Sequence, residues 1–301
     1  METFRDIDPA SPDRPELGYN KFKRYQAGIE LSMTAYDLTQ TPNLWFERLL
    51  SLDPDYVSHR IEDFLNEDLP EGDATTQATV APDIQAQAEL VANQALVFAG
   101  EQVLPHIFGQ SVVQLLVHDG EAVTAGTVLA RLRGPARELL IRERVMLNLL
   151  QRLCGIATLT REYTKLPAPA GFKILDTRKT TPGLRLFEKY AVAVAGAYNH
   201  RLDLSSVIMI KDNHLVAAGG IPQALAKVRA ENIRELFVEL EVDNLTQLDE
   251  ALELGGFDAF LLDNMPPETI REAVNRVRTH PKGGMRIFLE ASGGITRDSL
   301  A

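Results

Sequence analysis

Short apolar runs alternate with amphipathic stretches of helical spacing through the second half of the chain. Helical spacing covers segments such as 221–230 and 266–277, which lie between the apolar runs. Five of these runs end on polar or charged residues: FKILDTRKTT (172–181), VIMIKDNH (207–214), FVELEVDN (237–244), AFLLDN (259–264) and RIFLEASGG (286–294). Buried strands alternating with helices predict a parallel sheet. Polar residues at the carboxyl ends of successive strands are typical of a (β/α) barrel site.

The first half of the chain has a different pattern. Residues 1–45 carry scattered prolines and few apolar clusters, so we expect an N-terminal extension. Apolar residues recur at helical spacing over 45–65, with a break near Pro54, and again over 137–159. Residues 77–134 read as short strands and turns. We therefore predict an α/β domain over 46–150 and a (β/α) barrel domain over 151–301.

One β segment has a possible second interpretation. LLVHDGEAVTAGTVLARLRG (115–134) resembles the hairpins of lipoyl and biotinyl carriers. Those carriers need a lysine in the hairpin for attachment of the cofactor. Residues 102–136 contain no lysine, which argues against the carrier function and leaves a hammerhead-like β unit as the expected architecture.

Composition and charge exclude several classes of protein. The chain has 301 residues, of which 45% are hydrophobic, so a sizeable core is expected. No apolar run reaches about 18 residues, which argues against a membrane span. A net charge of −11 argues against general binding to nucleic acid or membrane surfaces. The single cysteine and the polar, acidic N-terminus, without a secretory signal, favour a cytoplasmic chain.

Charge is unevenly distributed along the chain. Residues 131–214 hold 15 Lys and Arg against 7 Asp and Glu. A basic middle in an acidic protein fits either a cationic pocket for a small anion or a helix rich in exposed arginine.

The candidate site residues lie at the ends of the predicted strands. The basic groups are Arg178, Lys179, His200, Arg201 and Lys211; the acidic groups are Glu241, Asp243, Asp263 and Glu290; and a Ser292-Gly293-Gly294 turn follows the last strand. Arginine and lysine bind carboxylates and phosphates. Carboxylates hold Mg²⁺ or ribose hydroxyls, and a glycine-rich turn lets backbone N–H groups approach a phosphate. Each group alone also fits a structural role, but together they predict a substrate with phosphates, a sugar and carboxylates.

These segments resemble a known enzyme family. DTRKTTPGLRLFEKYAV, NHRLDL, IKDNH, ELEVDNL, LLDN and EASGG, in this order and spacing, are similar to quinolinate phosphoribosyltransferase. The upstream stretches NEDLPEGDATT and RERVMLNLLQRLCGIAT match as well, so the resemblance covers roughly 62–296. A molybdenum-linked family shares the TRKT element but differs at IKDNH. The resemblance implies transfer of phosphoribose from 5-phosphoribosyl pyrophosphate to quinolinate with decarboxylation, in the presence of Mg²⁺.

The resemblance also implies roles for individual residues. Quinolinate is expected to contact Arg178, His200, Arg201, Lys211 and Arg144, the last donated by the neighbouring subunit of a homodimer. Phosphoribosyl pyrophosphate is expected at Lys179, Glu241, Asp263, Ser292, Gly293 and Gly294. Lys211, Glu241 and Asp263 are the catalytic candidates, and Glu241 and Asp263 are the candidate Mg²⁺ ligands.

Two features depart from the family pattern. The glycine triplet that usually precedes NHR reads Ala195-Gly196-Ala197, and alanine fits there only with a negative φ. The sequence ends at Ala301, soon after SGG, so we expect a barrel that lacks its last strand. These departures leave open a weakly active relative that binds a phosphorylated ligand, and the molybdenum-linked family remains a further alternative.

Overall fold

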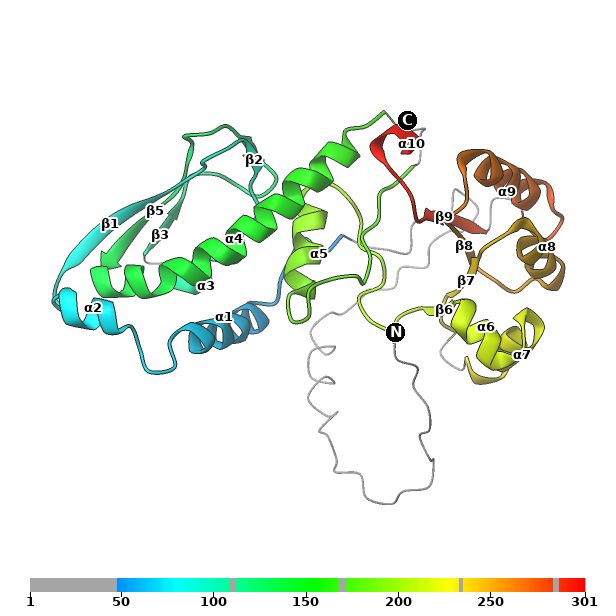
Figure 1. Cartoon of the computed structure of the whole chain (residues 1–301), viewed down its shortest axis with the longest axis horizontal. Helices are drawn as coiled ribbons and strands as arrows, with labels where there is room; N and C mark the ends of the chain where they lie inside the picture. Colours follow the sequence, from blue (N-terminus) through cyan, green and yellow to red (C-terminus); the bar gives the residue numbers. More distant parts are fainter. Residues whose placement is uncertain (1–47, 109–111, 168–171, 233–234, 284–286, 301) are drawn as a thin grey trace, which may run out of the picture. The chain divides into compact units, whose positions relative to one another are not determined.

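The computed structural model describes residues 48–108, 112–167, 172–232, 235–283 and 287–300 (Figure 1). The predicted extension, 1–45, lies outside these residues. The helices are α1 (Pro54–Asp68), α2 (Ala74–Thr79), α3 (Leu104–Phe108), α4 (Ala136–Thr164), α5 (Arg185–Val194), α6 (Asp212–Ala218), α7 (Ile221–Glu231), α8 (Leu245–Leu254), α9 (Pro267–Thr279) and α10 (Arg297–Leu300). The strands are β1 (Gln85–Val91), β2 (Leu96–Val97), β3 (Val113–Leu115), β4 (Ala122–Val123), β5 (Val128–Pro135), β6 (Ile208–Ile210), β7 (Val238–Val242), β8 (Ala259–Asp263) and β9 (Phe288–Ser292).

The N-terminal part combines a small antiparallel sheet with the long helix α4. The sheet has the order β1-β5-β3, and β2 pairs with β4 in a separate ribbon. The buried side of α4 includes Leu149, Leu150 and Leu153, which belong to the same hydrophobic cluster as Phe98 and Leu132. The prediction of short strands and turns over 77–134 is confirmed, with the addition of α3. The predicted helix over 137–159 is α4.

The boundary that we expect at residue 150 lies inside α4, which runs without interruption from Ala136 to Thr164.

The turn before α2 has the capping geometry typical of a helix start. The side chain of Asp73 accepts hydrogen bonds from the backbone N–H and the hydroxyl of Thr76.

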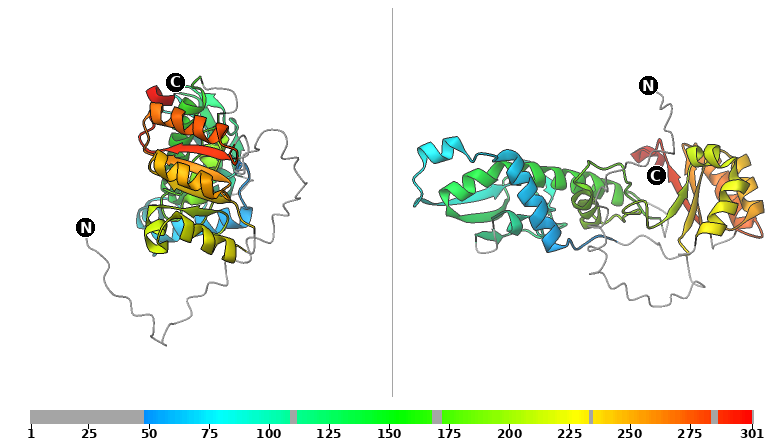
Figure 2. Two further views of the ribbon diagram at one scale, coloured as in Figure 1. Left: turned by 90° about the vertical axis from the view of Figure 1, so that its right-hand side faces the viewer. Right: turned by 90° about the horizontal axis from the view of Figure 1, so that it is seen from below.

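The C-terminal part contains a parallel sheet in the order β6-β7-β8-β9. Helices α6 to α9 follow these strands and cover one face of the sheet (Figure 2). The side chains that point to this face form a hydrophobic cluster with the helices, including Leu240, Phe260 and Leu262. Because side chains alternate along a strand, the other face carries the polar residues.

One of the five predicted strands differs in the structure. Segment 172–181 makes a single parallel bridge, between Leu175 and Tyr198, rather than a strand. The pairing consists of the hydrogen bonds from the N–H of Asp176 to the carbonyl of Tyr198 and from the N–H of Tyr198 to the carbonyl of Ile174. The other four predicted strands are β6 to β9. Within the described residues, β6 and β9 are the edges of this sheet.

Among the described residues, no helix combines the length and the apolar character needed to cross a membrane.

Candidate active site

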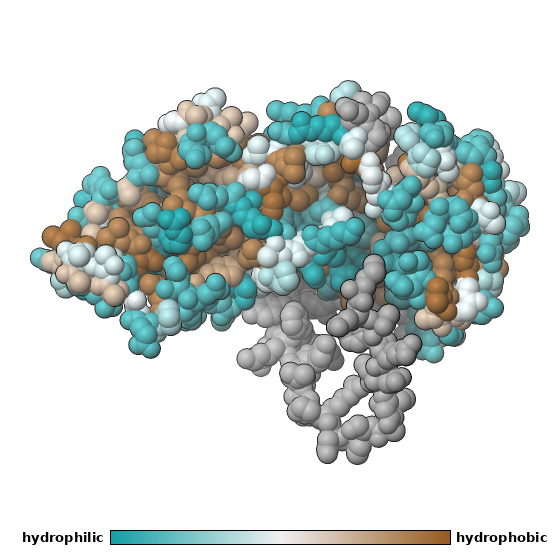
Figure 3. Space-filling view, in the orientation of Figure 1, coloured by the Kyte–Doolittle hydropathy of each residue, from teal (hydrophilic) through white to brown (hydrophobic). Residues whose placement is uncertain are grey.

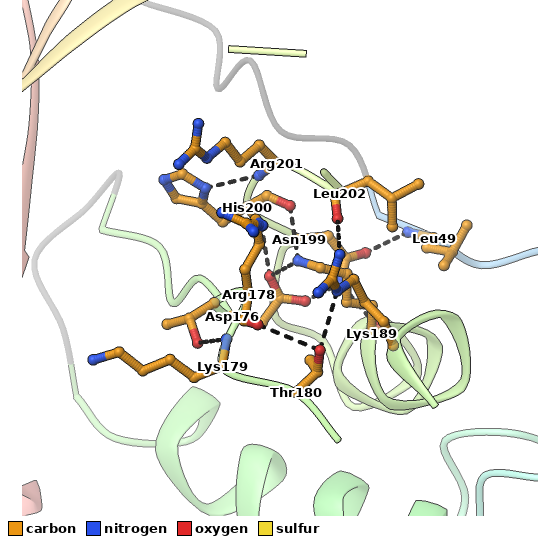
Figure 4. Close-up of polar contacts among 12 residues, drawn as sticks. Leu49, Asp176, Arg178, Lys179, Thr180, Lys189, Asn199, His200, Arg201 and Leu202 are labelled. Carbon is orange, nitrogen blue, oxygen red and sulfur yellow. Dashed lines mark hydrogen bonds and ion pairs between the residues drawn. The ribbon is translucent and has the colours of Figure 1, made fainter. Parts of the chain in front are cut away.

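A buried hydrogen-bond network holds the segment that contains His200 and Arg201 (Figure 4). The carboxylate of Asp176 accepts from Lys189 Nζ at 2.5 Å, from the backbone N–H of His200 at 2.7 Å and from Asn199 Nδ2 at 2.7 Å. Lys189 Nζ also donates to the carbonyl of His200 at 2.8 Å. The side chains of Lys189 and Asp176 are only 1% and 8% exposed. Both backbone polar groups of His200 are therefore fixed by this buried ion pair.

Burial lowers the pKa of Lys189, and the carboxylate of Asp176 opposes this effect. The amide of Asn199 completes the network, because its Oδ1 accepts from the backbone N–H of Leu49 at 2.6 Å.

Two arginines stand next to this network. Arg201 is buried, and its guanidinium donates to the carbonyl of Val207 at 3.0 Å. Burial lowers the pKa of Arg201, and the nearby charge of Arg178 adds to this effect. Nε of Arg178 is buried and makes no hydrogen bond within the described part of the chain. A guanidinium can donate two parallel hydrogen bonds to a carboxylate, so Arg178 and Arg201 are suited to bind one.

His200 faces two glutamates, the buried Glu239 and the largely buried Glu290. Its Nε2 is 3.5 Å from a carboxylate oxygen of Glu239 and 3.5 Å from one of Glu290. Burial opposes protonation of the ring, but the two glutamates outweigh it and raise the pKa of His200 to about 9. Burial also raises the pKa of Glu239, against the opposing effect of His200.

The ends of β6 and β7 bring together a lysine and a glutamate. Nζ of Lys211 donates to the carboxylate of Glu241. The lysine side chain is 40% exposed, whereas that of the glutamate is 12% exposed, so the pair sits at the rim of the polar face. Register places Asp263 opposite Ser292 at the same ends of β8 and β9. Paired residues of parallel strands point to one face, so these four side chains share it.

The turn after β9 approaches the loop after β8 closely. The backbone N–H of Asn264 donates to the carbonyl of Ser292 at 2.8 Å. A Cβ on Gly293 would lie 2.0 Å from Oδ1 of Asn264, and φ of Gly293 is +80°. Only glycine satisfies both conditions. Gly294 also has a positive φ, +64°, and a Cβ there would meet no atom within 4 Å, so its backbone faces open space.

The alanines in place of the family's glycines fit the backbone. Ala195 has φ −76°, and Ala197 is not among the described residues with positive φ. Gly196, between them, has φ +104° and is the position that requires glycine. The conformation of this turn therefore gives no reason for displacement of His200 and Arg201.

Two predicted site residues stand apart from this arrangement. Lys179 is exposed, and its backbone N–H donates to Thr177 within the local turn. Arg144 is exposed on α4, and no hydrogen bond or ion pair links it to the other site residues that the structure describes. Its donation to a neighbouring subunit stays a prediction.

Sequence reasoning missed the residues that support the site. Asp176, Lys189 and Asn199 lie inside the quoted motifs, but no role was expected for them. Glu239 precedes Glu241 by two positions, so both point to the same face of β7. That spacing is the signal which identifies Glu239.

The chain matches family models of known proteins over almost all of its described length. Residues 73–154 match the quinolinate phosphoribosyl transferase N-terminal domain, and 156–301 match the C-terminal domain of the same family. The chain is 44% identical over 241 residues to the probable nicotinate-nucleotide pyrophosphorylase [carboxylating] of Bacillus subtilis, covering 79% of this chain and 81% of the relative. It is 40% identical over 244 residues to the corresponding probable enzyme of Synechocystis, covering 80% and 81%.

A solved structure agrees with these matches. The crystal structure of NadC from Streptococcus pyogenes has a TM-score of 0.75 and 39% sequence identity to this chain, covering 83% of this chain and 87% of NadC. It shares the two-domain fold. The chain therefore belongs to the quinolinate phosphoribosyltransferase family.

Proposed function

We infer that this chain transfers phosphoribose from 5-phosphoribosyl pyrophosphate to quinolinate and releases carbon dioxide. The products are nicotinate mononucleotide and pyrophosphate, in a step of NAD biosynthesis. Relatives of 44% and 40% identity carry the name of this activity. The observation that carries the proposal is the buried Arg201 beside the half-buried Arg178, whose Nε is buried, in a protein with a net charge of −11.

We assign quinolinate to the site formed by these arginines, His200 and Lys211. Quinolinate carries two adjacent carboxylates, and a guanidinium binds a carboxylate through two parallel hydrogen bonds. The buried Nε of Arg178 supports this assignment, because it has a hydrogen to donate and no described acceptor. Lys211 is half-exposed and forms an ion pair with Glu241, and its ammonium group is expected between the two substrates.

We assign phosphoribosyl pyrophosphate to the ends of β7, β8 and β9. The open backbone at Gly294 and the close turn at Gly293 suit a 5-phosphate next to Ser292, because backbone N–H groups there can approach it. Glu241 and Asp263 are expected at the ribose, and the exposed Lys179 is expected at the pyrophosphate.

Glu241 and Asp263 are the residues that would hold Mg²⁺. Both offer carboxylate oxygens, the ligands that Mg²⁺ prefers, and both are partly buried at the same sheet edge. The residues therefore fit the ion. Bound Mg²⁺ offsets the charge of the pyrophosphate leaving group.

The reaction needs charge stabilisation more than proton transfer. When pyrophosphate leaves, positive charge develops on the ribose, and the carboxylates of Glu241 and Asp263 stabilise it. The ring nitrogen of quinolinate then bonds to the ribose carbon and becomes a pyridinium. The pyridinium accepts the electron pair left when the adjacent carboxylate departs as carbon dioxide, and a proton takes its place on the ring. Arg178 and Arg201 hold the dianion in position for this attack.

The proposal includes a homodimer with shared sites. Arg144 is exposed on α4 and is expected to reach the quinolinate of the neighbouring subunit. Apolar side chains are exposed on the same helix, with Leu140 46% and Leu159 54% accessible. Figure 3 shows hydrophobic residues gathered on the surface over β1, β5 and α4, which suits contact with a second chain.

A cytoplasmic location is also part of the proposal, since Cys154 is the only cysteine and no internal disulfide can form.

The experiment that tests this function mixes the purified chain with quinolinate, phosphoribosyl pyrophosphate and Mg²⁺. Carbon dioxide and pyrophosphate should be released together, and nicotinate in place of quinolinate should give neither. Tight binding of phosphoribosyl pyrophosphate without turnover would contradict the proposal and favour a binding protein. Equal turnover of nicotinate would contradict a site built for two carboxylates.

A further inference from the structure

Two glutamates are buried on the polar face of the C-terminal sheet. The side chain of Glu239, on β7, is 0% exposed, and that of Glu290, on β9, is 11% exposed. On the strand between them, Glu239 is paired with Ala259 and Glu290 is paired with Leu261. Both carboxylates therefore point to the face that carries Lys211 and Glu241. A buried carboxylate is costly unless a partner stabilises it.

The partner that both glutamates share is His200. Its Nε2 lies 3.5 Å from Oε2 of each carboxylate. Within the described residues, neither oxygen of Glu239 accepts a hydrogen bond of ordinary length, and neither does Oε1 of Glu290. The three groups thus form a cluster in which one ring nitrogen faces two acidic side chains.

The other ring nitrogen shows where the proton of the imidazole resides. The backbone N–H of Arg201 donates to Nδ1 of His200 at 2.8 Å. Nδ1 therefore has a lone pair, and the ring proton is on Nε2, facing the carboxylates. A second proton on the ring would leave Nε2 protonated as well. That second proton would be on Nδ1 and would remove the hydrogen bond from Arg201, so the ring is held from both sides when its single proton is on Nε2.

We propose that Glu239 and Glu290 are positioning residues that hold the imidazole of His200 through Nε2–H and thereby fix Arg201 for the substrate. This inference rests on the proposed function. The ring is tied to the backbone of Arg201 by the hydrogen bond at Nδ1. The other end of Arg201 is held by Val207 and Met209, through contacts of 3.0 and 3.6 Å. A rotation of the ring would therefore break the hydrogen bond at Nδ1 and release the backbone of Arg201 from it.

A metal ion is the alternative occupant of this cluster. The ligand atoms of His200, Glu239 and Glu290 all lie within 4.8 Å of one another. A divalent cation would need a lone pair on Nε2, and the proton of a neutral ring would then be on Nδ1. That proton would face the backbone N–H of Arg201, 2.8 Å away. The geometry favours a proton bridge over a metal.

The first test compares steady-state kinetics of Glu239→Gln with those of the wild type. The amide keeps the size of the side chain and removes its charge, so the KM for quinolinate should rise about 10- to 100-fold, as for loss of a hydrogen bond to a charged group. The kcat should change by less than about threefold and the KM for phosphoribosyl pyrophosphate should stay the same, because the group acts through binding of one substrate. Glu290→Gln should act in the same direction, and Glu239→Asp should recover part of the loss.

Glu272→Gln serves as the matched control, because Glu272 is an exposed partner of Arg276 on α9. It should behave as the wild type. An unchanged KM for quinolinate in Glu239→Gln would overturn the proposal, and so would an equal rise in KM for both substrates, which indicates a merely structural role.

The second test does not need activity. Nitrogen-15 NMR of the full chain, without substrate or metal, reports which ring nitrogen of each histidine carries a proton. The chain has six histidines, and the His200→Gln variant assigns the relevant ring. A protonated Nε2 that shifts in Glu239→Gln or Glu290→Gln supports the proposal. An unprotonated Nε2, or binding of added Zn²⁺ that Glu239→Gln abolishes, overturns it.

The two tests separate the two claims. Absence of turnover by the wild type would reject the proposed function, whereas the NMR result still decides whether the glutamates hold His200. If Glu239→Gln does not fold, the wild-type spectrum still shows whether Nε2 of His200 is protonated, and Glu290→Gln, at the more exposed glutamate, still shows whether a glutamate holds the ring.

Discussion

Replacement of Asp176 by asparagine should destabilise the protein strongly, because it leaves Lys189 charged and buried. Three donors meet at the carboxylate of Asp176: Lys189 Nζ, the backbone N–H of His200 and Nδ2 of Asn199. An asparagine cannot accept from all three, since its NH₂ group must face at least one donor. The amide of Asn199 cannot turn to compensate, because its Oδ1 already accepts from Leu49.

The magnitude follows from burial of the pair. With Lys189 1% and Asp176 8% exposed, removal of one partner is expected to cost about 3–5 kcal/mol in the free energy of unfolding. The double variant Asp176→Asn with Lys189→Met removes both charges and should be more stable than Asp176→Asn alone. The energies of the two single changes should therefore not add.

Urea unfolding followed by circular dichroism measures these differences. Glu272→Gln, which removes an exposed ion pair, is the control and should cost less than about 1 kcal/mol. Asp176→Asn should also raise the KM for quinolinate in protein that remains folded, because both backbone groups of His200 depend on the network. A loss of stability below about 1 kcal/mol for Asp176→Asn would contradict a buried ion pair between Asp176 and Lys189.

Four further predictions concern the site. Arg178→Ala should raise the KM for quinolinate by an amount equivalent to about 1.5–3 kcal/mol, and an unchanged KM would remove Arg178 from the site. Gly293→Ala should weaken binding of phosphoribosyl pyrophosphate more than Gly294→Ala, since only the former brings a Cβ against Asn264. Isothermal titration calorimetry measures both affinities. Equal affinities would show that the turn does not bind this substrate. Because the pKa of His200 is raised to about 9 in the folded protein, its protonation stabilises the fold fully below about pH 6.5, and this contribution should be lost as the pH rises through about 9. Urea unfolding at several pH values measures it. The same pH dependence of stability in His200→Gln and in the wild type would contradict this prediction. Arg144→Ala mixed with Arg178→Ala should regain activity in heterodimers, and failure to complement would argue against a shared site.

Much of the fold follows from local pattern. The apolar runs over 207–210, 237–242, 259–262 and 287–289 are long enough and regular enough to identify β6 to β9, and the structure has Lys211, Glu241, Asp263 and Ser292 at the carboxyl ends of these strands. Such positions can be predicted from sequence because parallel strands have their carboxyl ends at one edge of the sheet, and side chains alternate between its two faces.

The residues that hold the site residues in place could not be predicted from the sequence pattern in the same way. Asp176 and Lys189 are 13 residues apart in the chain, and Glu239 and Glu290 lie on strands separated by β8. Their association depends on tertiary packing, which periodicity does not describe. The charge of Lys189 itself favours an exposed position by ordinary rules, and its burial is possible because Asp176 compensates it.

The same limit applies to segment 172–181, where apolar residues predict a strand. The structure has one bridge there, between Leu175 and Tyr198, next to the buried network of Asp176. Ala195 and Ala197 show the converse case. Both alanines differ from the glycine triplet that the family resemblance implies, but in this turn the backbone requires glycine only at Gly196, whose φ is positive.

We propose that cationic and acidic strand ends form one site for quinolinate and phosphoribosyl pyrophosphate. The most direct measurement uses quinolinate labelled at the carboxyl group next to the ring nitrogen and follows labelled carbon dioxide together with pyrophosphate. We expect one carbon dioxide for each pyrophosphate, dependent on both substrates and strongly reduced in Arg178→Ala. Pyrophosphate release without labelled carbon dioxide, or no release by the folded wild-type protein, would contradict the account.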